Sequence, residues 1–289
     1  MRVAVVGATG LLGRSLVPLL LENDHVVLAL ARSPAKASEV LPPNADILPG
    51  DLLSPGIEEQ LFSLLEGVDA VFHIATAIPA DPDSPGAWDV NTRLRTDGTR
   101  TLLRASLKAG VKRYIQQSIT MAYPDRGETW ITEGTALDVS PGRASLCGPV
   151  IGMEGLVHSL AGQGMQTCIL RGGGFVGPGT GQERLMAELR AGKVVVEGSG
   201  RNFVSLIHVA DMAAACLAAL QSAPAGSVFN IVAEPIRHVD YLDRLADALG
   251  IPRPPRDGHL PTPPSWRCSN ELARTVLGWG PKHPIVPSI

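Results

Sequence analysis

The chain opens with the sequence Val3-Ala4-Val5-Val6-Gly7-Ala8-Thr9-Gly10-Leu11-Leu12-Gly13, in which three glycines separate two apolar runs. The first run predicts a buried strand, and the second predicts a helix. Glycine is required where a tight turn brings backbone N–H groups close to a diphosphate. The spacing G-x-x-G-x-x-G after a first strand therefore predicts a dinucleotide site. The residues of this turn that we expect to contact the dinucleotide are Gly7, Thr9, Gly10, Leu11, Leu12 and Gly13.

Short apolar runs and longer helix-like stretches alternate along the next part of the chain. This alternation predicts βαβ units with right-handed crossovers, and hence an α/β fold with a doubly wound parallel sheet of Rossmann type. The predicted strands are residues 2–6, 25–30, 45–48, 69–74, 112–117, 166–170 and 227–232. The predicted helices include residues 11–21, 57–65, 91–109, 149–161 and 211–221.

After residue 172, segments rich in glycine and proline interrupt this rhythm. Such segments are typical of loops, so we expect a smaller C-terminal region that binds substrate. The predicted dinucleotide-binding core is residues 1–172 with contributions from about 206–234. The predicted substrate-binding region is 173–205 and 235–289.

The bulk composition excludes several classes of protein. Hydrophobic residues make up 45%, charged residues 18%, and the net charge is −3, so a nucleic-acid partner is not expected. We find no apolar run of membrane-spanning length and no leader-like start, which predicts a cytoplasmic protein with no membrane partner. The 4 cysteines are widely spaced without a C-x-x-C pair, so neither a metal site nor a disulfide framework is predicted.

The end of the second strand indicates which dinucleotide is bound. The sequence Leu30-Ala31-Arg32-Ser33-Pro34-Ala35-Lys36 contains no carboxylate for the ribose hydroxyls of NAD(H). A guanidinium suits a 2′-phosphate, so Arg32, supported by Lys36 or Arg14, favours NADP(H) over NAD(H). The alternative is that Arg32 is a solvated loop residue.

Further motifs follow in order, and they are Gly50-Asp51-Leu52, residues 69–77, Asn91 with Gly98-Thr99, residues 112–118, residues 170–179 and residues 204–213. With the glycine turn, they resemble the extended branch of the short-chain dehydrogenase/reductase superfamily, of the NAD-dependent epimerase/dehydratase type, over nearly the whole length. The resemblance implies a small-molecule substrate and a homodimer through helices 91–109 and 147–163. It also implies further cofactor contacts, at Asp51, Leu52, Ala75, Thr76, Ala77, Ser118 and Gly173.

The chain differs from this family at the positions of the catalytic residues. In the family, a tyrosine is the acid or base, a lysine four residues later lowers its pKa, and a serine or threonine orients the substrate. This chain has 3 tyrosines, and none of them is followed four residues later by lysine. Counting back from Glu154 places Val150 at the lysine position and Leu146 at the tyrosine position. Counting back from Tyr123 places Ile119 at the hydroxyl position.

Two hydroxyl groups remain as catalytic candidates. Thr120 is next to the expected hydroxyl position, and Tyr123 lies just past the fifth strand. A packing role for Tyr123 is the alternative that we favour, and no register shift supplies a Tyr-x-x-x-Lys pair.

Three functions fit this pattern. The first is an atypical NADP(H)-dependent reductase or isomerase of a small carbonyl or enone-like substrate, in which positioning and cofactor chemistry suffice. The second is a redox-neutral cyclase, epimerase or lyase with a structural cofactor or none. The third is a non-catalytic protein that senses NADP(H). Consumption of the cofactor distinguishes the three functions. The first consumes NADPH, the second converts substrate with the cofactor unchanged, and the third binds the cofactor without turnover.

Overall fold

The computed structural model describes residues 1–79, 81, 84–160 and 162–287. Its backbone contacts group into two compact units. Unit 1 comprises Met1–Ser118, Val139–Leu170 and Cys216–Val228, and unit 2 comprises Ile119–Asp138, Arg171–Ala215 and Phe229–Ile289. Residue 161 of the predicted helix 149–161 and residues 288–289 of the predicted C-terminal region lie outside the described residues.

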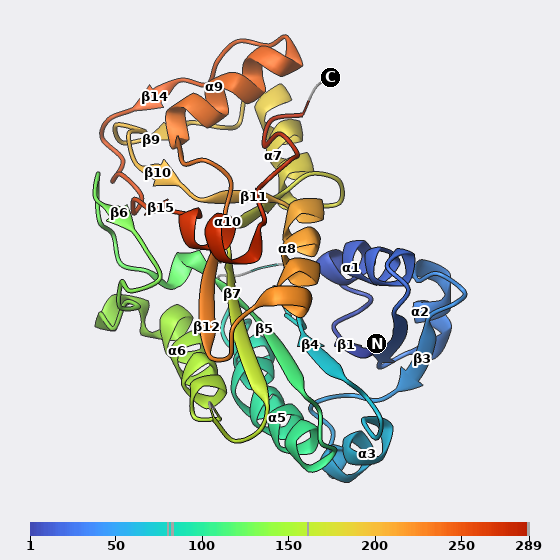
Figure 1. Cartoon of the computed structure of the whole chain (residues 1–289). Coiled ribbons are helices and arrows are strands. Elements are labelled where there is room, and N and C mark those ends of the chain that lie inside the picture. Colours follow the sequence, from blue (N-terminus) through green and yellow to red (C-terminus); the bar gives the residue numbers. More distant parts are fainter. Residues whose placement is uncertain (80, 82–83, 161, 288–289) are drawn as a thin grey trace. The chain divides into compact units, whose positions relative to one another are not determined.

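Unit 1 is built on a seven-stranded sheet with the order β12-β7-β5-β4-β1-β2-β3 (Figure 1). Its strands are β1 (Arg2–Val6), β2 (Val26–Ala31), β3 (Asp46–Pro49), β4 (Ala70–His73), β5 (Arg113–Ile119), β7 (Gln166–Gly172) and β12 (Ser227–Ile231). Neighbouring strands from β3 to β5 pair in parallel. The last residues of β5, β7 and β12 are grouped with unit 2.

The helices of unit 1 connect these strands. They are α1 (Leu11–Glu22), α2 (Pro34–Val40), α3 (Ile57–Leu64), α4 (Asp89–Arg93), η1 (Leu94–Gly98), α5 (Thr99–Lys108), η3 (Pro141–Arg143), α6 (Ala144–His158) and the end of α8 (Val209–Ser222). The strand order reverses after β3, so right-handed crossovers place α1 and α2 on one face and α3, α5 and α6 on the other. The predicted α/β class with a doubly wound Rossmann sheet is confirmed.

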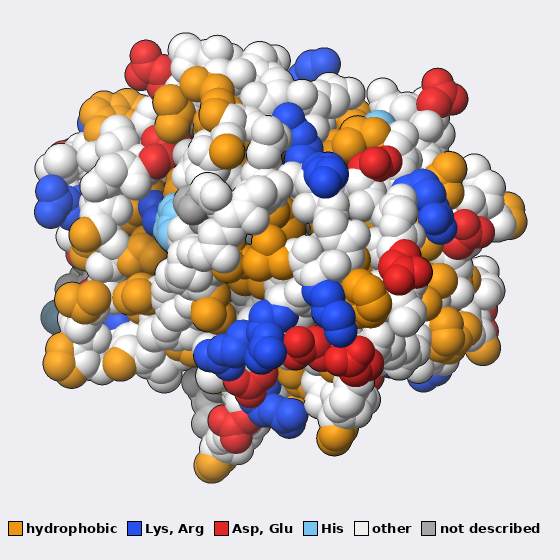
Figure 2. Space-filling view, turned by 60° about the horizontal axis from the view of Figure 1, so that its bottom comes forward, with side chains coloured by type: hydrophobic (Ala, Val, Ile, Leu, Met, Phe, Trp, Pro, Cys, Tyr) orange, Lys and Arg blue, Asp and Glu red, His pale blue; other side chains and the backbone are white. Residues whose placement is uncertain are grey.

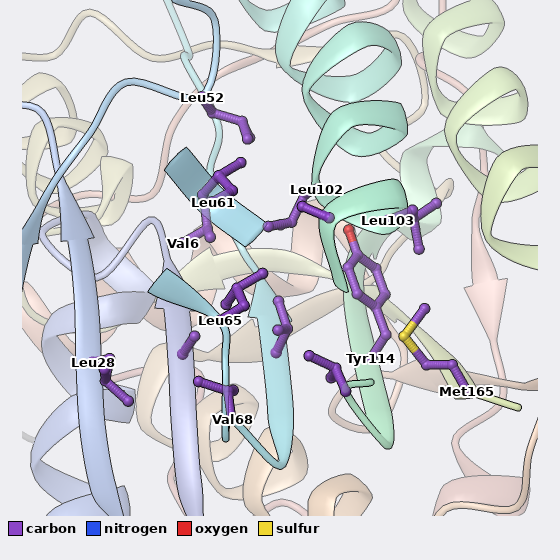
Figure 3. Close-up of a cluster of buried hydrophobic side chains, with 14 of the residues drawn as sticks. Val6, Leu28, Leu52, Leu61, Leu65, Val68, Leu102, Leu103, Tyr114 and Met165 are labelled. Atoms are coloured by element: carbon purple, nitrogen blue, oxygen red, sulfur yellow. The ribbon is translucent and has the colours of Figure 1, made fainter. Parts of the chain in front are cut away.

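A hydrophobic core fills the space between the sheet and the α3–α5–α6 face (Figure 3). Tyr114 of β5 is 0% exposed, and Leu102 and Leu103 of α5 pack in the same cluster as Leu61 of α3. Burial of this apolar surface is the main driving force for closing the crossovers onto the sheet. It also holds the strand ends, where the candidate site lies, on a rigid support.

The predicted helix 91–109 is three segments in the structure. It begins at Asp89 in α4, passes through the π-helical turn η1, and continues as α5 to Lys108. Within the turn, Thr96 Oγ1 donates to the Thr92 carbonyl at 3.0 Å, and Gly98 adds a residue of low helix propensity. A π-turn changes which side chains face inward, and here Arg95 is buried.

Unit 2 contains short elements instead of a large sheet. Its elements are η2 (Thr120–Ala122), β6 (Trp130–Ile131), β8 (Gly174–Val176), α7 (Gly181–Arg190), β9 (Val196–Glu197), β10 (Phe203–Val204), β11 (Leu206–His208), the start of α8, β13 (Ile236–Arg237), α9 (His238–Leu249), β14 (Arg256–Asp257), β15 (Arg267–Cys268) and α10 (Glu271–Leu277). The strands form two-stranded pairs, β10 with β13, β11 with β8, β14 with β9 and β15 with β6. A core of its own includes Leu242 and Leu245 of α9.

The surface carries mixed charge. On the face in Figure 2, basic side chains adjoin acidic ones, which agrees with the net charge of −3. Among the described residues, no helix is both long and apolar enough to cross a membrane.

Candidate functional site

The glycine turn between β1 and α1 is shaped for close backbone approach. Gly7 has φ +102°, and a Cβ there would lie 2.6 Å from the Ala75 backbone nitrogen. A Cβ on Gly13 would lie 2.2 Å from the Ala8 carbonyl oxygen. Neither position can hold a side chain, so the turn and the loop after β4 pack backbone against backbone. These contacts fit a cradle for the diphosphate of a dinucleotide.

The first turn of α1 is left open to a ligand. Gly10 is the N-cap residue, and no side chain caps the helix. Thr9 and Gly10 are exposed, Leu11 is half-buried, and Leu12 is buried. Unsatisfied N–H groups and the positive end of the helix dipole attract an anion at such a terminus.

Arg32 follows β2 directly and is exposed. Ser33 is the N-cap of α2 and accepts a hydrogen bond from the Lys36 backbone at 3.5 Å, and the Lys36 side chain is exposed. At the end of the neighbouring strand, Asp51 Oδ1 accepts from the Leu53 backbone at 3.0 Å. Two cationic side chains thus accompany a half-buried carboxylate at the carboxyl ends of β2 and β3.

The loop after β4 is fixed by Asn91. The Ala77 backbone N–H donates to Asn91 Oδ1 at 3.2 Å, and the Ile74 N–H donates to the Val6 carbonyl at 2.9 Å. Thr76 between them is exposed. The structure therefore brings the loop Ala75–Ala77 against the glycine turn, as the resemblance implies for a cofactor site.

At the carboxyl end of β5, Ser118 is 0% exposed and donates to Glu154 Oε1 of α6 at 2.6 Å. Val150 lies one turn earlier on the same helix and is 1% exposed, and Leu146 is half-buried. Both aliphatic residues, which counting along the sequence assigns to the lysine and tyrosine positions, therefore lie on the helix that Glu154 joins to β5.

The two catalytic candidates lie in unit 2, and the hydroxyl group of each forms hydrogen bonds within the protein. Thr120 Oγ1 donates to the Gly172 carbonyl at 3.3 Å. The Tyr123 hydroxyl donates to Asn230 Oδ1 at 2.9 Å and accepts from Arg171 Nη1 at 2.6 Å. Burial raises the pKa of Tyr123, and the opposing effect of Arg171 is smaller. This placement favours the packing role of Tyr123 over proton transfer.

Two remaining residues of the predicted site also belong to unit 2. A Cβ on Gly173 would lie 2.8 Å from the Ser205 carbonyl oxygen, and the Gly173 N–H donates to the Ile231 carbonyl at 3.0 Å. Ile119, at the expected hydroxyl position, is half-buried.

Sequence reasoning missed Arg95. The helical region from 89 to 108 carries arginines at 93, 95, 100 and 104, and amphipathic spacing alone does not single out one of them. Arg95 lies in the π-helical turn η1 and is buried there.

A doubly wound sheet with a glycine turn of this geometry defines the class of dinucleotide-fold proteins. Residues 3–232 match the model of the NAD dependent epimerase/dehydratase family, and the chain belongs to that family. The family name identifies the cofactor class as a nicotinamide dinucleotide.

Similar proteins include named enzymes. The chain is 34% identical to the 3-diazoavenalumate denitrifying reductase of a Streptomyces species, over 98% of this chain and 97% of that protein. It is 27% identical to a 3 beta-hydroxysteroid dehydrogenase/Delta 5→4-isomerase of Mycobacterium tuberculosis, over 98% of this chain and 76% of that protein. The chain is an enzyme of this oxidoreductase or isomerase type.

Solved structures agree on the fold. UDP-glucuronic acid 4-epimerase from Bacillus cereus, in complex with UDP-glucuronic acid and NAD, has a TM-score of 0.80 at 21% identity. That likeness covers 99% of this chain and 95% of the epimerase.

Proposed function

We propose that the protein is an atypical NADP(H)-dependent reductase whose substrate takes up a hydride without a proton from the protein. The observation that supports this proposal is the sequence of α6, in which counting back from Glu154 assigns Leu146 and Val150 to the positions of the phenol and the ammonium. Aliphatic side chains cannot transfer a proton or stabilise an oxyanion. The engaged hydroxyl of Tyr123 supports the same conclusion.

The residues proposed to hold the dinucleotide lie at or just after the carboxyl ends of strands. The glycine turn takes the diphosphate, and the loop Ala75–Ala77 with Ser118 borders the nicotinamide half. Asp51 with Leu52 takes the adenine side, and Arg32 with Lys36 takes the 2′-phosphate, which favours NADP(H) over NAD(H). Gly173 is a further proposed contact of the nicotinamide. When bound, the dinucleotide supplies a hydride.

An aryl diazonium ion is the substrate class that fits this site best. Hydride addition to a carbonyl carbon leaves an alkoxide that needs a proton. A carbon bearing a diazonium group needs none, because the hydride pair forms the new C–H bond while the C–N pair leaves with dinitrogen. Charge and protons then balance without an acid. The relative named as a 3-diazoavenalumate denitrifying reductase, matched over its whole length, supports this choice.

A carbonyl or enone substrate is the second candidate. The relative named as a steroid dehydrogenase/isomerase favours it. In this case water must supply the proton, and a redox-neutral isomerisation becomes a further outcome of the same test. The remaining proposals are a cytoplasmic location and a homodimer through residues 91–109 and 147–163.

The test uses NADPH deuterated at both C4 positions, with an aryl diazonium salt and, in parallel, a panel of enones and ketones. We expect a deuterated arene, with dinitrogen release equal to NADPH oxidation and a rate above that without protein. Product formed without NADPH oxidation would support the redox-neutral alternative. Tight NADPH binding without turnover of any compound would support the sensor.

A further inference from the structure

A cluster of buried polar side chains lies between β5, η1 and α6, within unit 1. Ser118 is 0% exposed, Glu154 is 3% exposed and Arg95 is 5% exposed. Burying charged groups is expensive, and well-packed apolar side chains often replace such a pair without loss of stability. The cluster lies one helical turn from Val150, on the same buried face of α6.

The hydrogen bond from Ser118 to Glu154 makes the hydroxyl proton unavailable for donation to a substrate. The Oγ to Oε1 distance is 2.6 Å, at the short end of the range for O–H···O hydrogen bonds. A serine has a single proton to donate. While Glu154 accepts it, Ser118 cannot donate to a substrate oxygen.

Arg95 supplies the positive charge of the cluster from the neighbouring helix. Burial lowers its pKa to about 10, and the attraction of Glu154 opposes that change. Its Nη1 contacts Met153 Sδ at 3.6 Å, a weak acceptor for a guanidinium. The charge also helps to keep His73 of β4 neutral, because it adds to the burial that lowers the pKa of His73 to about 4.

We propose that Arg95 and Glu154 are positioning residues of the dinucleotide site. Arg95 contacts α6 at Met153, the residue before Glu154. Glu154 binds the Ser118 hydroxyl, so the end of β5 is fixed to α6 and the Ser118 proton is already donated. Glu154 lies one helical turn past Val150, and the pair of Arg95 and Glu154 orders the site instead of transferring a proton. The inference rests on the proposed function, since it assigns the pair to the nicotinamide side of that site.

The decisive variant is the double substitution Arg95→Met with Glu154→Leu. It removes both buried charges together, so we expect a melting temperature no lower than that of the wild type. Because Ser118 is released, we expect the dissociation constant for NADPH, measured by calorimetry, to rise about tenfold. The variant Arg95→Lys keeps the charge and should retain most of the affinity.

The matched control is Arg104→Met with Glu58→Leu, an exposed pair at 3.3 Å between α5 and α3, which should leave the affinity unchanged. A stable Arg95→Met, Glu154→Leu variant that binds NADPH as tightly as the wild type would overturn the inference and leave the proposed function intact. If the double variant does not fold, Arg95→Lys and Arg95→Gln decide by the same measurement. Near-normal affinity in Arg95→Lys with a tenfold loss in Arg95→Gln supports a role for the charge, and equal affinities of the two variants contradict it. A wild type without affinity for either dinucleotide would defeat both proposals.

Discussion

At the scale of single residues, the proposed site depends on where side chains are excluded as much as on where they are present. Gly7 and Gly13 leave no room for a Cβ, while Arg32 and Lys36 extend freely from the end of β2. In the proposed site, backbone N–H groups therefore bind the diphosphate, and the two cationic side chains bind the 2′-phosphate.

The substitution Gly7→Ala tests the close approach. Its Cβ would lie 2.6 Å from the Ala75 nitrogen at φ +102°, so the turn must move. Gly110→Ala is the matched control, since φ is +74° there with nothing within 4 Å of the added atom. We expect Gly7→Ala to weaken NADPH binding at least tenfold and to lower the free energy of unfolding by about 1–3 kcal/mol more than the control. Equal effects in calorimetry and denaturant unfolding would contradict the close approach.

The substitution Arg32→Ala tests the choice of dinucleotide. Loss of a charge-assisted contact to the 2′-phosphate should raise the dissociation constant for NADPH about tenfold, with little change for NADH. Arg100→Ala on α5 removes another exposed arginine, and we expect it to change neither value. An unchanged ratio of the two affinities in Arg32→Ala would show that Arg32 is a solvated loop residue.

At the scale of elements, buried polar side chains tie strands and helices together in both units. Within unit 1, His73 Nδ1 of β4 lies 3.1 Å from the Tyr114 hydroxyl and 3.0 Å from Gln116 Oε1. Thr99 Oγ1 of α5 is 3.3 Å from the same nitrogen. These contacts link β4, β5 and α5 beneath the candidate site.

His73 predicts a pH dependence of stability. Burial lowers its pKa from 6.5 to about 4, so below pH 6.5 the unfolded chain binds a proton that the folded chain does not. The free energy of unfolding should therefore fall as pH drops from 6.5 towards 4, by about 1.4 kcal/mol per pH unit from this group. Urea unfolding of His73→Gln should show a shallower slope, while His259→Gln, at an exposed histidine, keeps the wild-type slope. An identical slope in His73→Gln would refute the assignment.

Within unit 2, Asp211 in the first turn of α8 anchors the C-terminal segment. Its side chain accepts from His283 Nδ1 at 2.7 Å and from the backbones of Lys282 and His283 at 3.0 and 2.9 Å. Asp211→Asn should lower the free energy of unfolding by about 2 kcal/mol or more, because buried bonds to a charged group are lost. Glu234→Gln breaks an exposed pair with Arg274 and should cost far less. Comparable losses for the two variants would argue against the anchor.

Sequence patterns located the regular elements well, because the spacing of apolar residues follows from which face of a strand or helix is buried. The strands near residues 2–6, 166–172 and 227–231 lie where apolar runs predict them. The short helix α2 was not predicted, since it has only Ala37 buried and shows no period. The π-turn and the burial of Arg95 were missed because they arise from packing between distant segments.

The candidate site was predictable in part for the same reason. The glycine turn and the loop after β4 follow each other in sequence order and meet because parallel strands align their carboxyl ends. The Tyr123 hydroxyl forms hydrogen bonds with Arg171 and Asn230, which lie far from it along the chain. A single sequence carries no signal for such contacts.

At the scale of the whole molecule, the proposed homodimer uses the outer side of α6. Gly148 and Gly155 are exposed there, and an added Cβ would meet nothing within 4 Å. Small residues on a helix surface permit a second helix to approach closely. The protomer itself therefore tolerates a larger side chain at these positions.

The substitution Gly155→Arg tests the dimer. We expect light scattering after size exclusion to show a monomer with a nearly unchanged far-ultraviolet spectrum, because only the interface is blocked. Gly181→Arg at the start of α7 is the control, since it also has open space around the added atom and should remain dimeric. A dimer that persists in Gly155→Arg would place the interface elsewhere, and a monomeric wild type would exclude it.

The central claim is that a bound nicotinamide dinucleotide reduces the substrate without proton transfer from the protein. The most direct measurement is single-turnover oxidation of NADPH by an aryl diazonium salt, followed by absorbance with protiated and C4-deuterated cofactor, in H₂O and in D₂O. We predict a slower reaction with deuterated cofactor and no effect of the solvent isotope. A solvent isotope effect on the hydride step, or turnover that leaves NADPH unconsumed, would contradict the account.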